Sequence, residues 1–155
     1  MIGFAALGAP ADTALSLVPL LTARGLGVGL IKRRSGVSHV FVGSSRRWAL
    51  TVDNEQPTDS EPFELVDELD TEALDVILVE GFKASSFPQI ELHLATSGDP
   101  LLADTDPYII AVATDEPQRV HVDLPVLNLN DPADIAEFIF LHLLLGETYP
   151  WGELE

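Results

Sequence analysis

The N-terminal part of the chain carries the pattern that most restricts its fold. Residues 2–7 form a short apolar run typical of a buried strand. From about residue 12 to Arg24 the apolar positions recur at helical spacing, and Gly25 is placed to end that helix. A second apolar run follows at residues 28–31. Because a strand, a helix and a second strand form a βαβ unit, the sequence predicts an α/β fold with a mostly parallel sheet flanked by helices.

The rest of the chain extends this pattern. Further strands are predicted at residues 37–42, 48–52, 75–80, 90–94, 108–113 and 125–129, and helices at 63–69 and after the start signal Asn130-Asp131-Pro132. The turn GSSRR should join residues 37–42 and 48–52 as a hairpin-like strand pair. Residues 75–80 are almost wholly apolar, which places them at the centre of the sheet. The polar residues 95–107 are predicted to be a loop.

Length and composition favour one domain in the cytoplasm. The 155 residues, 46% of them apolar, match a single domain over residues 1–146 with a C-terminal tail at 147–155. The apolar runs are too short to cross a bilayer, and the apolar N-terminus lacks the basic region of a signal peptide. The absence of cysteine excludes disulfides and thiolate chemistry, and the four histidines show no metal-ligand spacing.

The distribution of charged residues along the chain indicates which kinds of ligand it could bind. A net charge of −17 disfavours binding to nucleic acid or to anionic membranes, since phosphate contacts need a basic surface. Five of the eight basic residues nevertheless fall in one stretch, as Lys32, Arg33, Arg34, Arg46 and Arg47. Arginine forks suit phosphate oxygens, so this stretch is the natural place for an anionic ligand.

The loop between the first strand and the first helix is where P-loop proteins hold phosphate. Here the loop reads Gly8, Ala9, Pro10, Ala11, Asp12 and Thr13. Asp12 stands at the position of the motif lysine, and Pro10 removes one amide donor, so weak phosphate affinity is expected. Thr13 stands at the position of the magnesium-binding hydroxyl. Two readings stay open, because Thr13 also suits an ordinary first helical turn and Asp12 suits the N-terminal end of the helix dipole.

Other polar residues lie at predicted strand ends. Glu80 is placed to hold Mg²⁺, the alternative being a surface residue at a strand end. Lys83 could pair with Glu80 or with a phosphate, or be an isolated solvated lysine. The pair Thr114-Asp115 could meet a base edge, although capping a turn is favoured. His93 and His121 are interpreted as structural residues.

An ordered series of segments gives this chain a family resemblance. They are residues 20–25 (LLTARG), 28–32 (VGLIK), 47–50 (RWAL), 79–83 (VEGFK), 88–93 (PQIELH), 109–115 (IIAVATD) and 124–131 (LPVLNLND). Together they resemble MobB, the molybdopterin-guanine dinucleotide biosynthesis adaptor protein B family, over nearly the whole chain. The segment VEGFK is the most specific of them.

The resemblance implies a P-loop NTPase-like, GTP-binding fold, often homodimeric, with Mg²⁺ as the metal. It also implies a partner, either molybdopterin itself or the guanylyltransferase that attaches GMP to it. By position, Gly8 to Thr13 would be the phosphate loop, Glu80 the Walker-B-like carboxylate and Lys32 the start of the basic segment. The chain departs from the family at Asp12, and also at Arg33 and Arg34, which replace histidines. A loop that the family carries next is mostly missing here, so GTP hydrolysis is expected to be weak or lost.

Three functions follow from these residues. The first is an accessory protein of molybdenum-cofactor maturation that contacts a partner enzyme or the pterin phosphate. The second is a magnesium-dependent GTPase or small-molecule kinase, for which the missing lysine implies a large loss of rate. The third is an interaction module that has kept the scaffold without its ligands.

Overall fold

A computed structural model describes residues 2–6, 13–34, 37–42, 50–53, 74–80 and 87–145 of this chain. The predicted helix at 63–69 lies outside these residues. Within them the elements follow in the order β1 (Ile2–Ala6), α1 (Thr13–Thr22), β2 (Val28–Arg34), β3 (Val37–Val42), β4 (Leu50–Asp53), β5 (Val76–Glu80), β6 (Gln89–His93), the 3₁₀ turn η1 (Leu102–Asp104), β7 (Ile109–Thr114), the 3₁₀ turn η2 (Pro117–Arg119), β8 (Val126–Asn128) and α3 (Pro132–Leu145).

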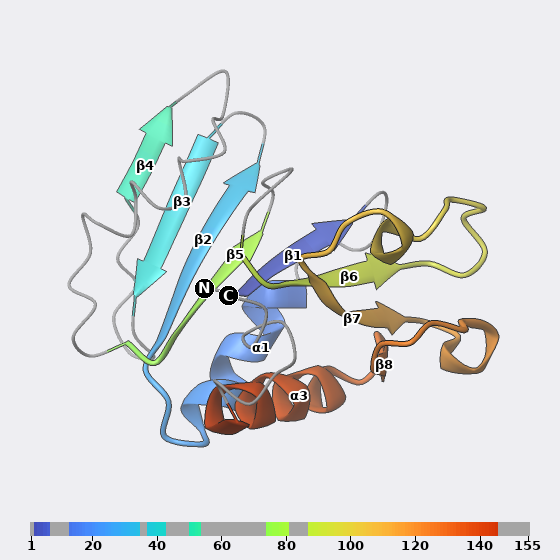
Figure 1. Ribbon diagram of the computed structural model, residues 1–155. Helices are drawn as coiled ribbons and strands as arrows, with labels where there is room; N and C mark the ends of the chain where they lie inside the picture. Colours follow the sequence, from blue (N-terminus) through green and yellow to red (C-terminus); the bar gives the residue numbers. More distant parts are fainter. Residues whose placement is uncertain are drawn as a thin grey trace.

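All the described strands belong to one sheet, in the order β4-β3-β2-β5-β1-β6-β7-β8 (Figure 1). Six neighbouring strands of the sheet run parallel to one another; they are β2, β5, β1, β6, β7 and β8. β3 pairs antiparallel with β2, and β4 pairs antiparallel with β3. The mostly parallel sheet and the hairpin-like strand pair predicted from the sequence are therefore confirmed. β5 lies between β2 and β1, which confirms the central place predicted for the almost wholly apolar residues 75–80.

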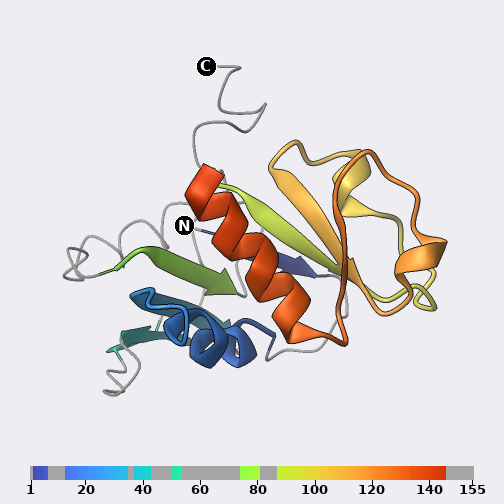
Figure 2. The same cartoon turned by 90° about the horizontal axis from the view of Figure 1, so that it is seen from below.

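Helices α1 and α3 pack against each other on one face of the sheet (Figures 1 and 2). Side chains alternate between the two faces of a strand, and every second residue of the inner strands turns towards these helices. The fully buried members of this layer include Ile2, Leu30, Leu78 and Ile90 from the sheet and Leu17, Leu21, Ile135 and Ile139 from the helices. This layer is the main hydrophobic core.

The opposite face of the sheet is buried as well. Ile31, Val79 and Val112 lie on this face and are at most 2% exposed. Burial on both faces explains why the parallel strands read as nearly continuous apolar runs instead of alternating ones. Two polar side chains of β6, Gln89 and Glu91, are also buried on this second face.

Helix α1 ends where the sequence predicts. Gly25 has a φ of +84°, which a residue without a Cβ adopts at little cost. The Leu26 amide donates to the Leu21 carbonyl at 3.3 Å, and the Gly25 amide donates to the Thr22 carbonyl at 3.0 Å. These two bonds form a Schellman motif, which satisfies carbonyls that the helix end would leave without partners.

Helix α3 begins with the predicted capping residue followed by proline. The Asp131 carboxylate accepts the Ala133 amide at 3.2 Å, and Pro132 occupies the first helical position. A second carboxylate, Asp134, accepts the Asn128 amide at 2.9 Å and so ties the helix to the end of β8.

Strand β2 extends to Arg34, three residues beyond the predicted end at Ile31. The extension pairs with β3 through Lys32↔His39, Arg33↔Ser38 and Arg34↔Val37. Because β2 pairs with the antiparallel strand β3, it continues beyond the row of Glu80, the last residue of its parallel neighbour β5. The apolar pattern of residues 28–31 does not reveal this extension. The predicted loop 95–107 likewise contains the short turn η1.

The predicted apolar face of α3 includes one histidine. His142 is 6% exposed and stacks on Phe138, with ring centroids 6.2 Å apart. Burial lowers the pKa of His142 from its ordinary value of 6.5, because the charged imidazolium loses its hydration. The folded protein therefore favours the neutral ring.

This burial predicts a loss of stability in mild acid. The contribution of a neutral His142 to the free energy of unfolding is complete above pH 6.5. It declines as the pH falls from there towards the lowered pKa of His142 in the folded protein. The decline is at most about 1.4 kcal/mol per pH unit for one proton. His142→Leu removes this proton, so the wild type should lose more stability than the variant between pH about 7.5 and about 5.5. Chemical denaturation at both pH values measures the difference, and equal losses in the two proteins would contradict the assignment.

Candidate functional site

The carboxyl ends of the parallel strands meet at one edge of the sheet, called the carboxyl edge below. Thr13 begins α1 just after β1, and Glu80 is the last residue of β5, the neighbour of β1. The register pairs Glu80 with Phe4 of β1 on one side and with Lys32 of β2 on the other. The fold therefore brings the candidate metal ligands, Thr13 and Glu80, to the same part of this edge.

Both of these side chains are buried. Thr13 and Glu80 are each 9% exposed. The interpretation of Glu80 as a surface residue at a strand end is therefore wrong: strand alternation puts Glu80 on the same face as Leu78, the face that α1 and α3 cover. Thr13 also belongs to the first turn of α1, where its carbonyl accepts the Ser16 hydroxyl at 2.6 Å.

This arrangement suits a magnesium ion with a phosphate group. A carboxylate and a hydroxyl are oxygen ligands of the kind Mg²⁺ prefers, and the ion usually completes its shell with water and phosphate oxygens. The amide groups at the N-terminus of α1 point towards an anion placed there. Thr13 and Glu80 could thus hold the metal, and α1 could receive the phosphate.

The other predicted site residues divide into two groups. Lys32, Arg33 and Arg34 lie in β2, where Lys32 is in register with Glu80 and, among the described strands, the two arginines pair only with β3. The remaining candidates lie outside the described residues; they are Gly8, Ala9, Pro10, Ala11, Asp12, Arg46, Arg47 and Lys83.

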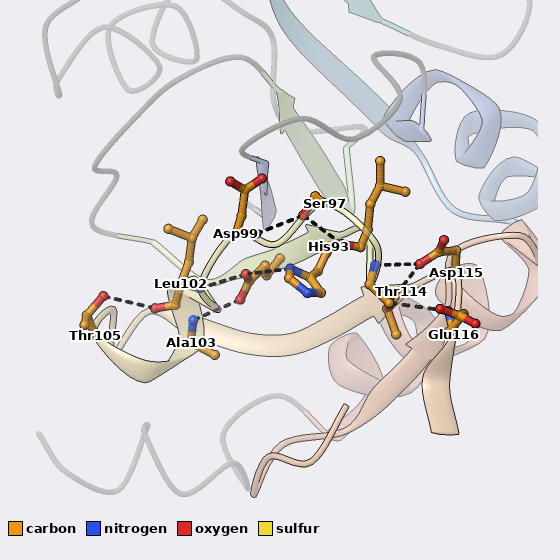
Figure 3. Close-up of polar contacts among 12 residues, drawn as sticks. His93, Ser97, Asp99, Leu102, Ala103, Thr105, Thr114, Asp115 and Glu116 are labelled. Carbon is orange, nitrogen blue, oxygen red and sulfur yellow. Dashed lines mark hydrogen bonds and ion pairs between the residues drawn. The ribbon is translucent and has the colours of Figure 1, made fainter. Parts of the chain in front are cut away.

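A second polar cluster lies where β6 and β7 end (Figure 3). The Asp115 carboxylate accepts the Ala95 amide at 2.9 Å and the Thr114 hydroxyl at 3.3 Å. The bond from the Ala95 amide holds the pKa of Asp115 below its ordinary value, against the desolvation of the carboxyl. Asp115 therefore caps the loop that follows β6, which is the role favoured by the sequence.

Sequence reasoning missed one buried carboxylate. Glu91, in the middle of β6, is 2% exposed, and its two oxygens accept the Leu102 and Ala103 amides at 2.7 and 2.9 Å (Figure 3). These bonds fix η1 to the second face of the sheet. His93 lies next to this carboxylate, with 3.9 Å between His93 Nδ1 and Glu91 Oε1. The available signal was an acidic residue within the predicted strand at residues 90–94.

A cavity of about 810 Å³ lies at the opposite, amino edge of the sheet, where β7 and β8 begin. Its polar lining consists of Asp104, Asp106, His121 and Asp123. Within the described parts of the chain, no three histidine or acidic side chains are grouped so that they could hold a metal ion. The cavity is also remote from Thr13 and Glu80, since those residues lie at the other edge of the sheet.

Among the helices that the structure describes, none is long and apolar enough to span a membrane.

Comparisons with known proteins give one consistent family. The family model of MobB, described as molybdopterin guanine dinucleotide synthesis protein B, matches residues 32–115. The molybdopterin-guanine dinucleotide biosynthesis adapter protein of Escherichia coli K12 is 32% identical over 160 aligned residues, which cover 90% of each chain. The protein of the same name from Haemophilus influenzae is 31% identical and covers 84% of this chain and 82% of its own length.

Solved structures agree on the fold. The crystal structure of a MobB homolog from Bacillus stearothermophilus superposes with a TM-score of 0.64 at 19% identity, and covers 92% of this chain and 97% of its own. A crystal structure of molybdopterin-guanine biosynthesis protein B superposes with a TM-score of 0.57, also at 19% identity, over 92% of this chain and 98% of its own. With its strand order and with similarity along almost its whole length, this chain belongs to the MobB family.

Proposed function

We propose that this chain is an accessory protein of molybdenum-cofactor biosynthesis, at the step that makes molybdopterin guanine dinucleotide. The observation that carries the proposal is the 32% identity to the E. coli adapter protein across 90% of both chains. The accessory protein acts in the cytoplasm, as a homodimer, by contacting the guanylyltransferase or molybdopterin itself. Residues 1–146 form its single domain, and residues 147–155 form a tail.

The carboxyl edge is the proposed site for GTP and Mg²⁺. Thr13 and Glu80 are the metal ligands, a role supported by their burial at the start of α1 and at the end of β5. The phosphate loop is formed by Gly8, Ala9, Pro10, Ala11, Asp12 and Thr13, and the anion contacts come from Lys32, Arg33, Arg34, Arg46, Arg47 and Lys83. Because Asp12 occupies the lysine position, the transferred phosphoryl group lacks its usual charge stabilisation and hydrolysis is weak or lost.

Calorimetric titration tests this site. The purified chain is titrated with GTP and with ATP, each with and without Mg²⁺. We expect magnesium-dependent binding of GTP that Glu80→Ala weakens about 10-fold or more, since a carboxylate ligand of the metal is removed. Asp123→Ala removes a carboxylate at the opposite edge and serves as the matched control.

The outcomes separate the candidate functions. Equal GTP affinity in the wild type and in Glu80→Ala would contradict the metal site. Steady release of phosphate that Glu80→Ala abolishes would instead support a magnesium-dependent GTPase. The absence of heat with either nucleotide would leave the accessory function to protein contacts alone, as in an interaction module.

A further inference from the structure

We infer that the cavity at the amino edge of the sheet is a docking site for a basic segment of a partner protein. Lysine or arginine side chains of that segment place their charged ends on the carboxylates of the cavity, and their aliphatic stems contact its apolar wall. The inference goes beyond the proposed function, because no residue of the cavity belongs to the proposed nucleotide site. Its failure would therefore leave the proposed function as it stands.

The size and the wall of the cavity select the kind of occupant. Its volume of about 810 Å³ falls in the range of ligand pockets, which is about 300 to 1,000 Å³. A space of this size admits a short stretch of peptide chain. Part of the lining is apolar; it comes from Ile109, Val120, Val122 and Leu124. An occupant with apolar stems and polar ends matches this lining better than a bare ion does.

The charge of the lining selects a cation. It contains three carboxylates, those of Asp104, Asp106 and Asp123, and neither lysine nor arginine. One oxygen of Asp106 accepts the Tyr108 amide at 2.9 Å. The side chains of Asp104 and Asp123 are exposed, and within the described parts of the chain they have no hydrogen bond or ion pair. Like charges grouped in this way repel one another, and a cation placed between them relieves the repulsion.

The cations nearest in sequence are already paired. Arg119 precedes the wall residue Val120, but its guanidinium contacts the Glu116 carboxylate at 2.8 Å. Arg24 is paired with Glu137 of α3. The positive charge must therefore come from outside, and the net charge of −17 attracts basic partners to this chain.

The two walls of the cavity are fixed by the fold. Buried Glu91 accepts both amides at the start of η1, at 2.7 and 2.9 Å, and η1 supplies Ala103 and Asp104 to one wall (Figure 3). The other wall, residues 120–124, leads to Pro125, whose carbonyl accepts an amide of β7 at 3.0 Å. A pocket that is formed in advance loses little conformational entropy when a ligand enters it.

An exposed aromatic residue favours a protein as the source of the cation. Tyr108 is 45% exposed and stands in sequence between the lining residues Pro107 and Ile109. Tyrosine is enriched among the residues that contribute most to protein interfaces, and its ring attracts lysine and arginine. Carboxylates, an apolar wall and a tyrosine together suit a basic protein segment better than a free amine.

Amide shift mapping by NMR on the isotope-labelled full chain tests the inference. The probe is an acetylated and amidated peptide of sequence GRLRG. Its control carries citrulline in place of arginine, which keeps the shape of the side chain and removes its charge. We expect saturable shifts at residues 103–109 and 120–124 with the arginine peptide, and binding about 10-fold weaker with the citrulline peptide. Spermidine and Mg²⁺ are titrated separately, as a free amine and a metal ion.

Variants that remove one charge each locate the contacts. Asp104→Asn and Asp123→Asn should each weaken binding of the arginine peptide about 3- to 5-fold, and the double variant about 10-fold or more, as expected for ion pairs near a protein surface. Asp99→Asn removes the same charge from an exposed position outside the cavity and should leave binding unchanged. Thermal melting verifies that each variant is folded.

Saturable shifts at both walls that need arginine and that both cavity variants weaken would support the inference. It would be overturned by the absence of saturable shifts, by shifts confined to other parts of the chain, by equal binding of the two peptides, or by equal losses in Asp99→Asn and the cavity variants. Spermidine that binds as tightly as the arginine peptide would assign the cavity to a free amine. Mg²⁺ that displaces the peptide would assign it to a metal ion, and either result would contradict a docking site for a protein.

Discussion

Replacing Leu78 with alanine will lower the free energy of unfolding by about 3 to 4 kcal/mol, the cost of losing a buried side chain and leaving a cavity. Leu78 is fully buried in β5, paired with Ile2 on one side and with Leu30 on the other. It lies in the layer between the sheet and the two helices. Urea denaturation of the two proteins measures the difference.

Leu144→Ala is the matched control for this substitution. Leu144 lies near the end of α3 and is 67% exposed, so the same truncation should change stability by less than about 0.5 kcal/mol. Similar effects at the two positions would show that β5 does not lie in the centre of the core.

Replacing Glu91 with alanine will cost about 2 to 4 kcal/mol. Hydrogen bonds to a charged group are stronger than average, and the truncation leaves two amide donors unsatisfied at the second face of the sheet. Those donors are the Leu102 and Ala103 amides, which hold η1 in place. Denaturation measures the loss, and faster hydrogen exchange at residues 102–104 locates it.

Glu116→Ala is the control for the buried carboxylate. Glu116 accepts a hydrogen bond from Arg119 at the surface, where such pairs contribute less than about 1 kcal/mol. A Glu91→Ala protein as stable as Glu116→Ala, with unchanged exchange in η1, would mean that the two amides find other acceptors.

Local patterns predicted the parts of the fold that depend on neighbouring residues. The βαβ unit, the end of α1 at Gly25 and the start of α3 at Pro132 follow from hydrophobic period and capping chemistry, and all three are confirmed. The apolar strand that ends in Glu80 was also recognised, because a strand buried on both faces has no polar alternation.

Long-range pairing was the part that the sequence did not reveal. The pattern of residues 28–31 predicted a strand, but neither its extension to Arg34 nor the insertion of β5 between β2 and β1. Both depend on partners far along the chain. The adjacency of Lys32 and Glu80 therefore emerges only from the register.

Buried polar groups were the other gap. A sequence pattern shows that Glu91 is acidic and that His142 lies on an apolar helical face. It does not show that two amides from η1 satisfy the Glu91 carboxylate, or that burial keeps His142 neutral. Both properties arise from tertiary contacts.

The most direct test of the accessory function is a reconstituted reaction. Purified molybdopterin guanylyltransferase, molybdopterin and Mg²⁺-GTP are combined with increasing amounts of this chain, and the rate of molybdopterin guanine dinucleotide formation is measured. We predict that the rate rises with the amount of the chain until it saturates. A rate that does not change at any concentration, together with no detectable binding to the guanylyltransferase, would contradict the proposed function.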